Sequence, residues 1–126
     1  MYLLKSPIQP GDLVVRPAKF GLFNHYGTGL SSGMIAHTTP GPGKHIGTLG
    51  EFADGQPVAV LRPVRTTLEN AMVEQRAVSN LGKPYALADN CEHDASFAQT
   101  GVPGSGTLKG ALILGGLFAL AKIVSD

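Results

Sequence analysis

A β-hairpin is predicted by residues 24–38, which read NHYGTGLSSGMIAHT. Two β-prone runs flank the short turn Leu30-Ser31-Ser32. In an antiparallel hairpin, the residue numbers of each facing pair add up to the same total. With a three-residue loop, His25 and His37 have the same total as the two glycines that flank the turn. The sequence therefore predicts two imidazoles directly opposite each other on one sheet face, with Cβ atoms about 4.5–5.5 Å apart.

The composition describes one weakly charged domain. The chain has 126 residues, of which 43% are hydrophobic and 15% are charged, and its net charge is +1. This charge balance does not favour a nucleic-acid partner. A single cysteine excludes an internal disulfide and a Cys-rich zinc site, and no metal or cofactor is expected. The first residues lack the apolar stretch of a signal peptide, so an intracellular location is expected.

Short strands are predicted before residue 64, and helices after it. Residues 11–17 and 57–63 are β-prone runs bounded by proline, whereas residues 39–56 are rich in Gly, Pro and Thr and are predicted to form a long loop. A first helix is predicted over 66–81 and a second over 91–100. The pattern predicts an α+β domain with a small antiparallel sheet and a helix that carries the cysteine, spanning residues 1–104.

The apolar tail, residues 105–126, is predicted to form a separate C-terminal helix. Its apolar run is short of the roughly 20 residues that cross a bilayer. Small residues at Ala111, Gly115 and Ala119 have the spacing that lets helices approach closely. Three roles remain open for Gly110–Val124: a core helix, membrane association, or self-association.

Cys91 is the only thiol, and it is predicted to be the first residue of a helix with Asn90 as the N-cap. Unpaired backbone N–H groups at a helix start favour a thiolate and lower the thiol pKa, while Glu92 and Asp94 oppose this. A thiolate with an imidazole pair would supply a nucleophile, a base and a group that orients the base. The alternatives are an inert buried cysteine and unrelated surface histidines.

The other histidines are weaker candidates. His45 lies in the predicted loop and is expected to be solvated. His93 is two residues after Cys91 on the same helix, so it points about 200° away from the thiol.

Two short motifs resemble those of the lecithin:retinol acyltransferase family, within the NlpC-type papain-like superfamily. The first is Asn90-Cys91-Glu92-His93. The second is Asn24-His25-Tyr26-Gly27, with His37 twelve residues after His25. Two further stretches, 10–14 and 81–85, resemble the flanking segments of that family. The resemblance implies a circularly permuted papain-like fold. It also implies Cys91 as nucleophile, His25 as base and His37 as the polar group that holds the base.

The implied chemistry is acyl transfer or hydrolysis through a thioester at Cys91, with lipid acyl groups as donors. In the oxyanion hole, the backbone N–H of Cys91 is one natural donor, and Asn90 and Tyr26 are candidate supporting residues. Two alternatives remain open: a thiol amidase or peptidase that acts on cell-wall peptides, and a non-catalytic binding or assembly module that retains the fold. One position departs from the family pattern, because Asp94 stands where an aromatic residue is usual.

Overall fold

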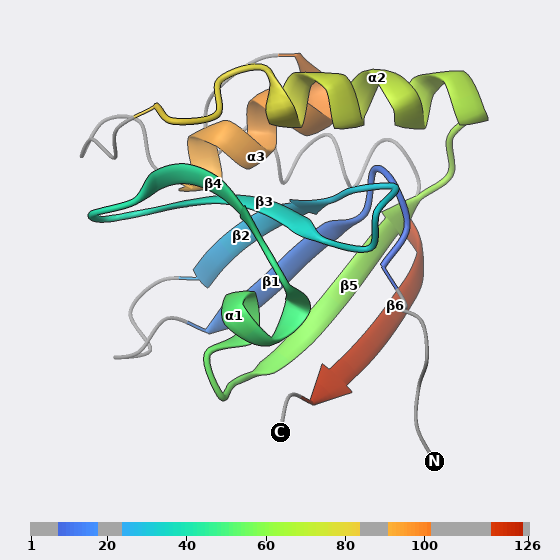
Figure 1. The fold of residues 1–126 in the computed structure, drawn as a ribbon. Coiled ribbons are helices and arrows are strands. Elements are labelled where there is room, and N and C mark those ends of the chain that lie inside the picture. The colour runs from blue at the N-terminus through green and yellow to red at the C-terminus, as the bar shows by residue number, and fades with distance from the viewer. Residues whose placement is uncertain (1–7, 18–23, 84–90, 102–116, 125–126) are drawn as a thin grey trace.

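The computed structural model describes residues 8–17, 24–83, 91–101 and 117–124, with side chains for all of these except 91–93 and 117–124. It contains one antiparallel sheet with the strand order β4-β3-β2-β1-β5-β6 (Figure 1). The strands are β1 (Leu13–Pro17), β2 (Asn24–Gly29), β3 (Ile35–Thr39), β4 (Gly43–Gly47), β5 (Pro57–Pro63) and β6 (Leu117–Val124). The predicted α+β class with a small antiparallel sheet is confirmed.

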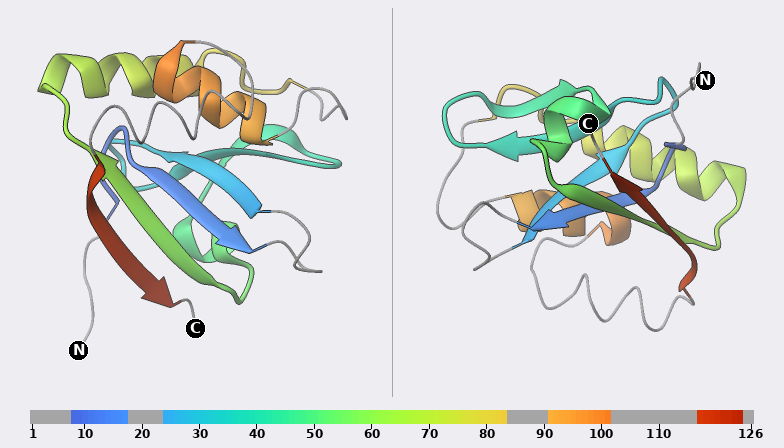
Figure 2. Two further views of the ribbon diagram at one scale, coloured as in Figure 1. Left: turned by 180° about the vertical axis from the view of Figure 1, so that it is seen from behind. Right: turned by 90° about the horizontal axis from the view of Figure 1, so that it is seen from below.

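Helices cover both faces of this sheet. The helices α2 (Thr67–Val78) and α3 (Cys91–Thr100) lie on one face, and the short helix α1 (Leu49–Ala53) lies against the other (Figures 1 and 2). Leu13 and Val14 are neighbours on β1 that point to opposite faces, and both are fully buried. The sheet is therefore the middle layer of the domain.

The two faces have separate cores. We call the side covered by α2 and α3 the helix face; its buried side chains contact one another in two groups, which include Leu30, Ala36, Val73, Ala77 and Ala98, and Leu13 with Ala95. We call the opposite side the histidine face; its core consists of Ile8, Val14, Ile35, Phe52, Ala53, Val58 and Val60.

The two predicted helices are confirmed, with small differences at their ends. The side chain of Thr66 accepts a hydrogen bond from the backbone N–H of Glu69, and the side chain of Glu69 accepts one from the backbone N–H of Thr66, as a capping box requires. The first helix ends at Val78 rather than at residue 81. The second helix ends at Thr100, and the following Gly101 has φ +81°, a left-handed conformation that stops a helix.

The predicted loop over residues 39–56 is wrong. These residues form β4 and α1, which are joined at Thr48. Thr48 and Glu51 make a second capping box, which starts the helix that buries Phe52. The Thr-x-x-Glu spacing signals this helix in the sequence, but the many glycines around it favour a loop.

The predicted C-terminal helix is also wrong over residues 117–124. This segment is strand β6, which pairs with β5 along its whole length. An apolar run fits a buried helix and a strand equally well, and pairing here covers what would be the open edge of β5. The rest of the tail, with Ala111 and Gly115, lies outside the described residues.

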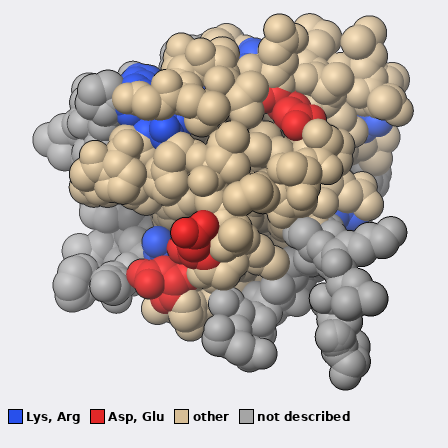
Figure 3. Space-filling model, viewed as in Figure 1, with Lys and Arg blue, Asp and Glu red and all other residues tan. Residues whose placement is uncertain are grey.

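Among the residues that the structure describes, no helix combines the length and the apolar character needed to span a bilayer. On the face seen in Figure 3, neutral side chains cover most of the surface, and charged ones lie in small separate groups.

Candidate active site

The predicted hairpin forms, but its register differs by two residues. Gly27 pairs with His37 and Gly29 pairs with Ile35, so the two histidines are not directly opposite each other. The turn lies one residue further along the chain than predicted, because Leu30 N donates to Met34 O at 2.9 Å and leaves residues 31–33 as the loop. A shift of two residues keeps every side chain on its face, whereas a shift of one would not. The two imidazoles therefore still share a face, as diagonal neighbours.

The two rings are hydrogen-bonded to each other. The distance from His25 Nε2 to His37 Nδ1 is 3.0 Å, and the rings meet edge to face at 76° with centroids 5.2 Å apart. Both side chains are buried, with exposed fractions of 8% for His25 and 5% for His37. Each ring is therefore held in place by the other and by the surrounding core.

Phe52 forms the floor beneath the pair. Its ring stacks on His25 with centroids 5.0 Å apart, and meets His37 edge to face at 5.3 Å. Gly27 lies between the two histidines on the histidine face, and a Cβ there would be only 2.9 Å from Phe52 Cε1. A glycine at this position therefore lets the phenyl ring approach the strand.

His45 belongs to the same cluster, and its prediction as a solvated loop residue is wrong. It lies on β4 directly opposite His37, and their ring centroids are 4.3 Å apart. Its Nδ1 is 2.9 Å from the carbonyl oxygen of Gly43. The sequence reveals this neighbour only if 43–47 is predicted to be a strand that pairs with 35–39. The Gly- and Pro-rich composition of this region favours a loop instead.

Burial keeps both imidazoles neutral. It lowers the pKa of His25 to about 4, with further lowering from the charges of Arg16 and His45. It lowers the pKa of His37 to about 3, where His25, His45 and Arg16 also lower it and Glu51 acts in the opposite direction. At neutral pH each ring therefore has one N–H donor and one acceptor nitrogen.

The shared hydrogen bond allows two tautomer pairs, of which one suits a base. If His25 Nε2–H donates to His37 Nδ1, then His25 Nδ1 is left as an acceptor that can take a proton. His37 then carries its proton on Nε2, which has no hydrogen-bond partner among the described residues. In this arrangement His37 orients His25, as a base requires.

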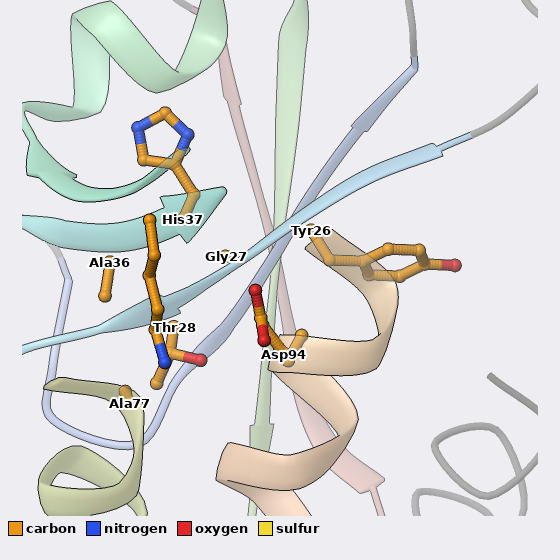
Figure 4. Close-up of a pocket in the computed structure, with 9 residues that line it drawn as sticks. Tyr26, Gly27, Thr28, Ala36, His37, Ala77 and Asp94 are labelled. Carbon is orange, nitrogen blue, oxygen red and sulfur yellow. The ribbon is translucent and has the colours of Figure 1, made fainter. Parts of the chain in front are cut away.

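Cys91 is the first residue of α3, as predicted, while its side chain and the whole of Asn90 lie outside the described residues. The helix packs on the helix face of the sheet, where Ala95 belongs to the same packed cluster as Tyr26 and Asp94 bonds to Thr38. Figure 4 shows His37 on one side of the strands, and Asp94 and Tyr26 with α3 on the other.

The structure thus brings His25 and His37 together, but α3 packs on the opposite face of the sheet. Tyr26, the candidate supporting residue, lies on the face of α3, as the alternation along β2 requires. Among the described side chains, no group of three or more His, Cys, Asp or Glu could hold a metal ion.

Comparisons with known proteins add no assignment. No family model, curated protein or solved structure matches the chain.

Proposed function

We propose that this chain is a cysteine-dependent acyltransferase or hydrolase in which Cys91 carries the acyl group as a thioester. The observation that carries the proposal is the hydrogen bond of 3.0 Å between His25 Nε2 and His37 Nδ1. It occupies one nitrogen of His25 and leaves the other for a thiol proton. The start of α3 at Cys91 adds support, because helix N-termini favour thiolates.

The proposed reaction has two steps. In the first, the Cys91 thiol gives its proton to His25 Nδ1, and the sulfur attacks the acyl carbonyl. The C–O or C–N bond of the donor breaks, and the leaving group takes the proton from His25. In the second step an alcohol, amine or water gives a proton to His25 and attacks the thioester carbonyl. The C–S bond then breaks, and the sulfur takes the proton from His25, which restores the thiol and the neutral imidazole.

The fold assignment within this proposal is a circularly permuted papain-like domain. An antiparallel sheet with the cysteine at the start of a packed helix is compatible with it, as is the order of the residues, with both histidines before the cysteine. His25 is the second residue of β2, so the proposal requires the thiol to reach its ring at the beginning of that strand.

Phospholipid acyl groups are the first proposed donor, and amide bonds in cell-wall peptides are the second. The assignment of 117–124 to a strand removes one argument for lipid, since this part of the tail is paired within the sheet. Vesicles of phosphatidylcholine and a short cell-wall peptide are therefore the two arms of a donor screen.

A second candidate function is a non-catalytic binding or assembly module. It is favoured by one observation: the histidine pair packs on Phe52, on the face away from α3. In that case the pair is a structural feature of the core, and Cys91 has the reactivity of an ordinary thiol.

Alkylation of Cys91 distinguishes these candidates. The chain has one cysteine, so the rate of modification by iodoacetamide reports this site alone. At pH 7 we expect Cys91 to react about tenfold faster than free cysteine, because its thiolate fraction is raised. His25→Gln is expected to remove most of this advantage while it keeps a polar side chain of similar size.

The matched control is Gln75→Ala on the exposed side of α2, which should leave the alkylation rate unchanged. Thermal melts of all variants identify any that fail to fold. An ordinary rate for the unmodified protein, or an equal rate in folded His25→Gln, would favour the non-catalytic module.

A further inference from the structure

The first turn of α3 is tied to the sheet by one buried carboxylate. Asp94 is 8% exposed, and it accepts a hydrogen bond from the hydroxyl of Thr38, which is 1% exposed. Its second oxygen forms an ion pair with Lys83, at 3.1 Å from Nζ. Burying a carboxylate costs free energy unless both of its oxygens have partners, and here Thr38 and Lys83 provide one partner each.

The position of Asp94 relates this network to the candidate nucleophile. Asp94 and Ala95 follow Cys91 by three and four residues, so the three lie along one side of the helix. Thr38 directly follows His37 on β3. One carboxylate therefore connects the helix that starts with the thiol to the strand that carries His37.

The partner of this carboxylate is itself fixed to the sheet. Lys44 N donates to Lys83 O at 2.8 Å, and Gly82 N donates to Lys44 O at the same distance. These two bonds attach Lys83 to β4, the strand beside β3. The Lys83–Asp94 pair therefore joins the two ends of the segment that leads into Cys91.

We propose that Asp94 is a positioning residue for Cys91, holding the first turn of α3 against β3 through Thr38 and joining it to β4 through Lys83. This inference rests on the proposed function, since it assigns Asp94 a role at that same thiol. It also accounts for an acid where the sequence resemblance leads us to expect an aromatic residue.

The ion pair has a second role in this arrangement. A carboxylate one turn from a thiol disfavours the thiolate, and the ammonium group of Lys83 offsets that charge. Tyr26 lines the same small hollow as Asp94 (Figure 4). Lys44, which is 3% exposed, also lines it. Lys83 and Lys44 are thus the cations that face Asp94 from the neighbouring elements.

The charge role is tested by the pH profile of Cys91 alkylation in four proteins: the unmodified chain, Lys83→Gln, Asp94→Asn and the double variant. Lys83→Gln is expected to raise the apparent thiol pKa by about one unit, which means about tenfold less thiolate at neutral pH. In the double variant the pKa should return to within a few tenths of a unit. A double variant that keeps the full shift would overturn this role, because Lys83 would then act without Asp94.

The positioning role is tested through Thr38. Thr38→Val removes the hydroxyl and leaves every charge in place, so it should reduce the alkylation advantage that His25 confers from about tenfold to about twofold or less. Thr38→Ser keeps the hydroxyl and should keep the advantage. The positioning role is wrong if folded Thr38→Val retains all of it.

These outcomes are separable from a failure of the proposed function. If His25 confers no advantage even in the unmodified protein, the proposed function fails. The thiol pKa values of the four proteins still measure the coupling between Lys83 and Asp94 in that case, because every thiol titrates.

Discussion

Phe52→Ala is expected to lower the free energy of unfolding by about 4 kcal/mol, within the range for deleting a buried phenyl ring. Phe52 is fully buried and packs with Val14, Ile35 and Val58 in the core of the histidine face. It also contacts both imidazole rings, so the cavity would open directly beneath them. Urea unfolding followed by circular dichroism measures the loss.

The control for this prediction is Leu68→Ala on α2, where the side chain is 71% exposed. It should change stability by no more than about 0.5 kcal/mol. Phe52→Leu retains part of the volume and should fall between the two. A loss below about 1.5 kcal/mol for Phe52→Ala would show that this ring is not the centre of the core.

Acid is expected to destabilise the protein through the histidine pair. Burial holds the pKa of His25 at about 4 and that of His37 at about 3, below the value of 6.5 in the unfolded chain. As the pH falls below 6.5, the unfolded chain therefore binds protons before the folded one does. Stability that is present above pH 6.5 is lost down to about pH 4 through His25 and down to about pH 3 through His37, and the loss at pH 5 is about 2 kcal/mol for each histidine.

The measurement is the free energy of unfolding at pH 7.5 and pH 5 for the unmodified chain and for the double variant His25→Gln/His37→Gln. The double variant should lose about 4 kcal/mol less between the two pH values, whatever its stability at pH 7.5. Carboxylates contribute equally to both proteins and cancel in the comparison. An equal loss in both proteins would mean that the two imidazoles are not buried in their neutral form.

The shared face of His25 and His37 was predictable because it depends only on parity. The β period of two residues places both side chains on one face for any even shift, and the observed register differs by two. The exact pairing was not predictable, because it depends on which residues form the turn, and moving the turn by one residue changes the pairing by two. The bounds of α3 were predictable from local signals at Cys91 and Gly101.

The parts that the sequence did not reveal depend on contacts between distant segments. Leu117–Val124 is a strand because β5 offers it an edge, which a local apolar pattern cannot show. His45 joins the cluster because β4 pairs with β3. The side of the sheet that α3 covers is likewise a matter of packing, and it is the side of Tyr26 and not that of the histidines.

The central claim is that Cys91 carries an acyl group, and intact-mass spectrometry tests it most directly. The protein is incubated with phosphatidylcholine vesicles or with the cell-wall peptide, and then analysed with and without neutral hydroxylamine, which cleaves thioesters. We predict a mass increase equal to the transferred acyl group that hydroxylamine removes and that Cys91→Ala never shows. An unchanged mass with both donors, or an adduct that persists in Cys91→Ala, would contradict the claim.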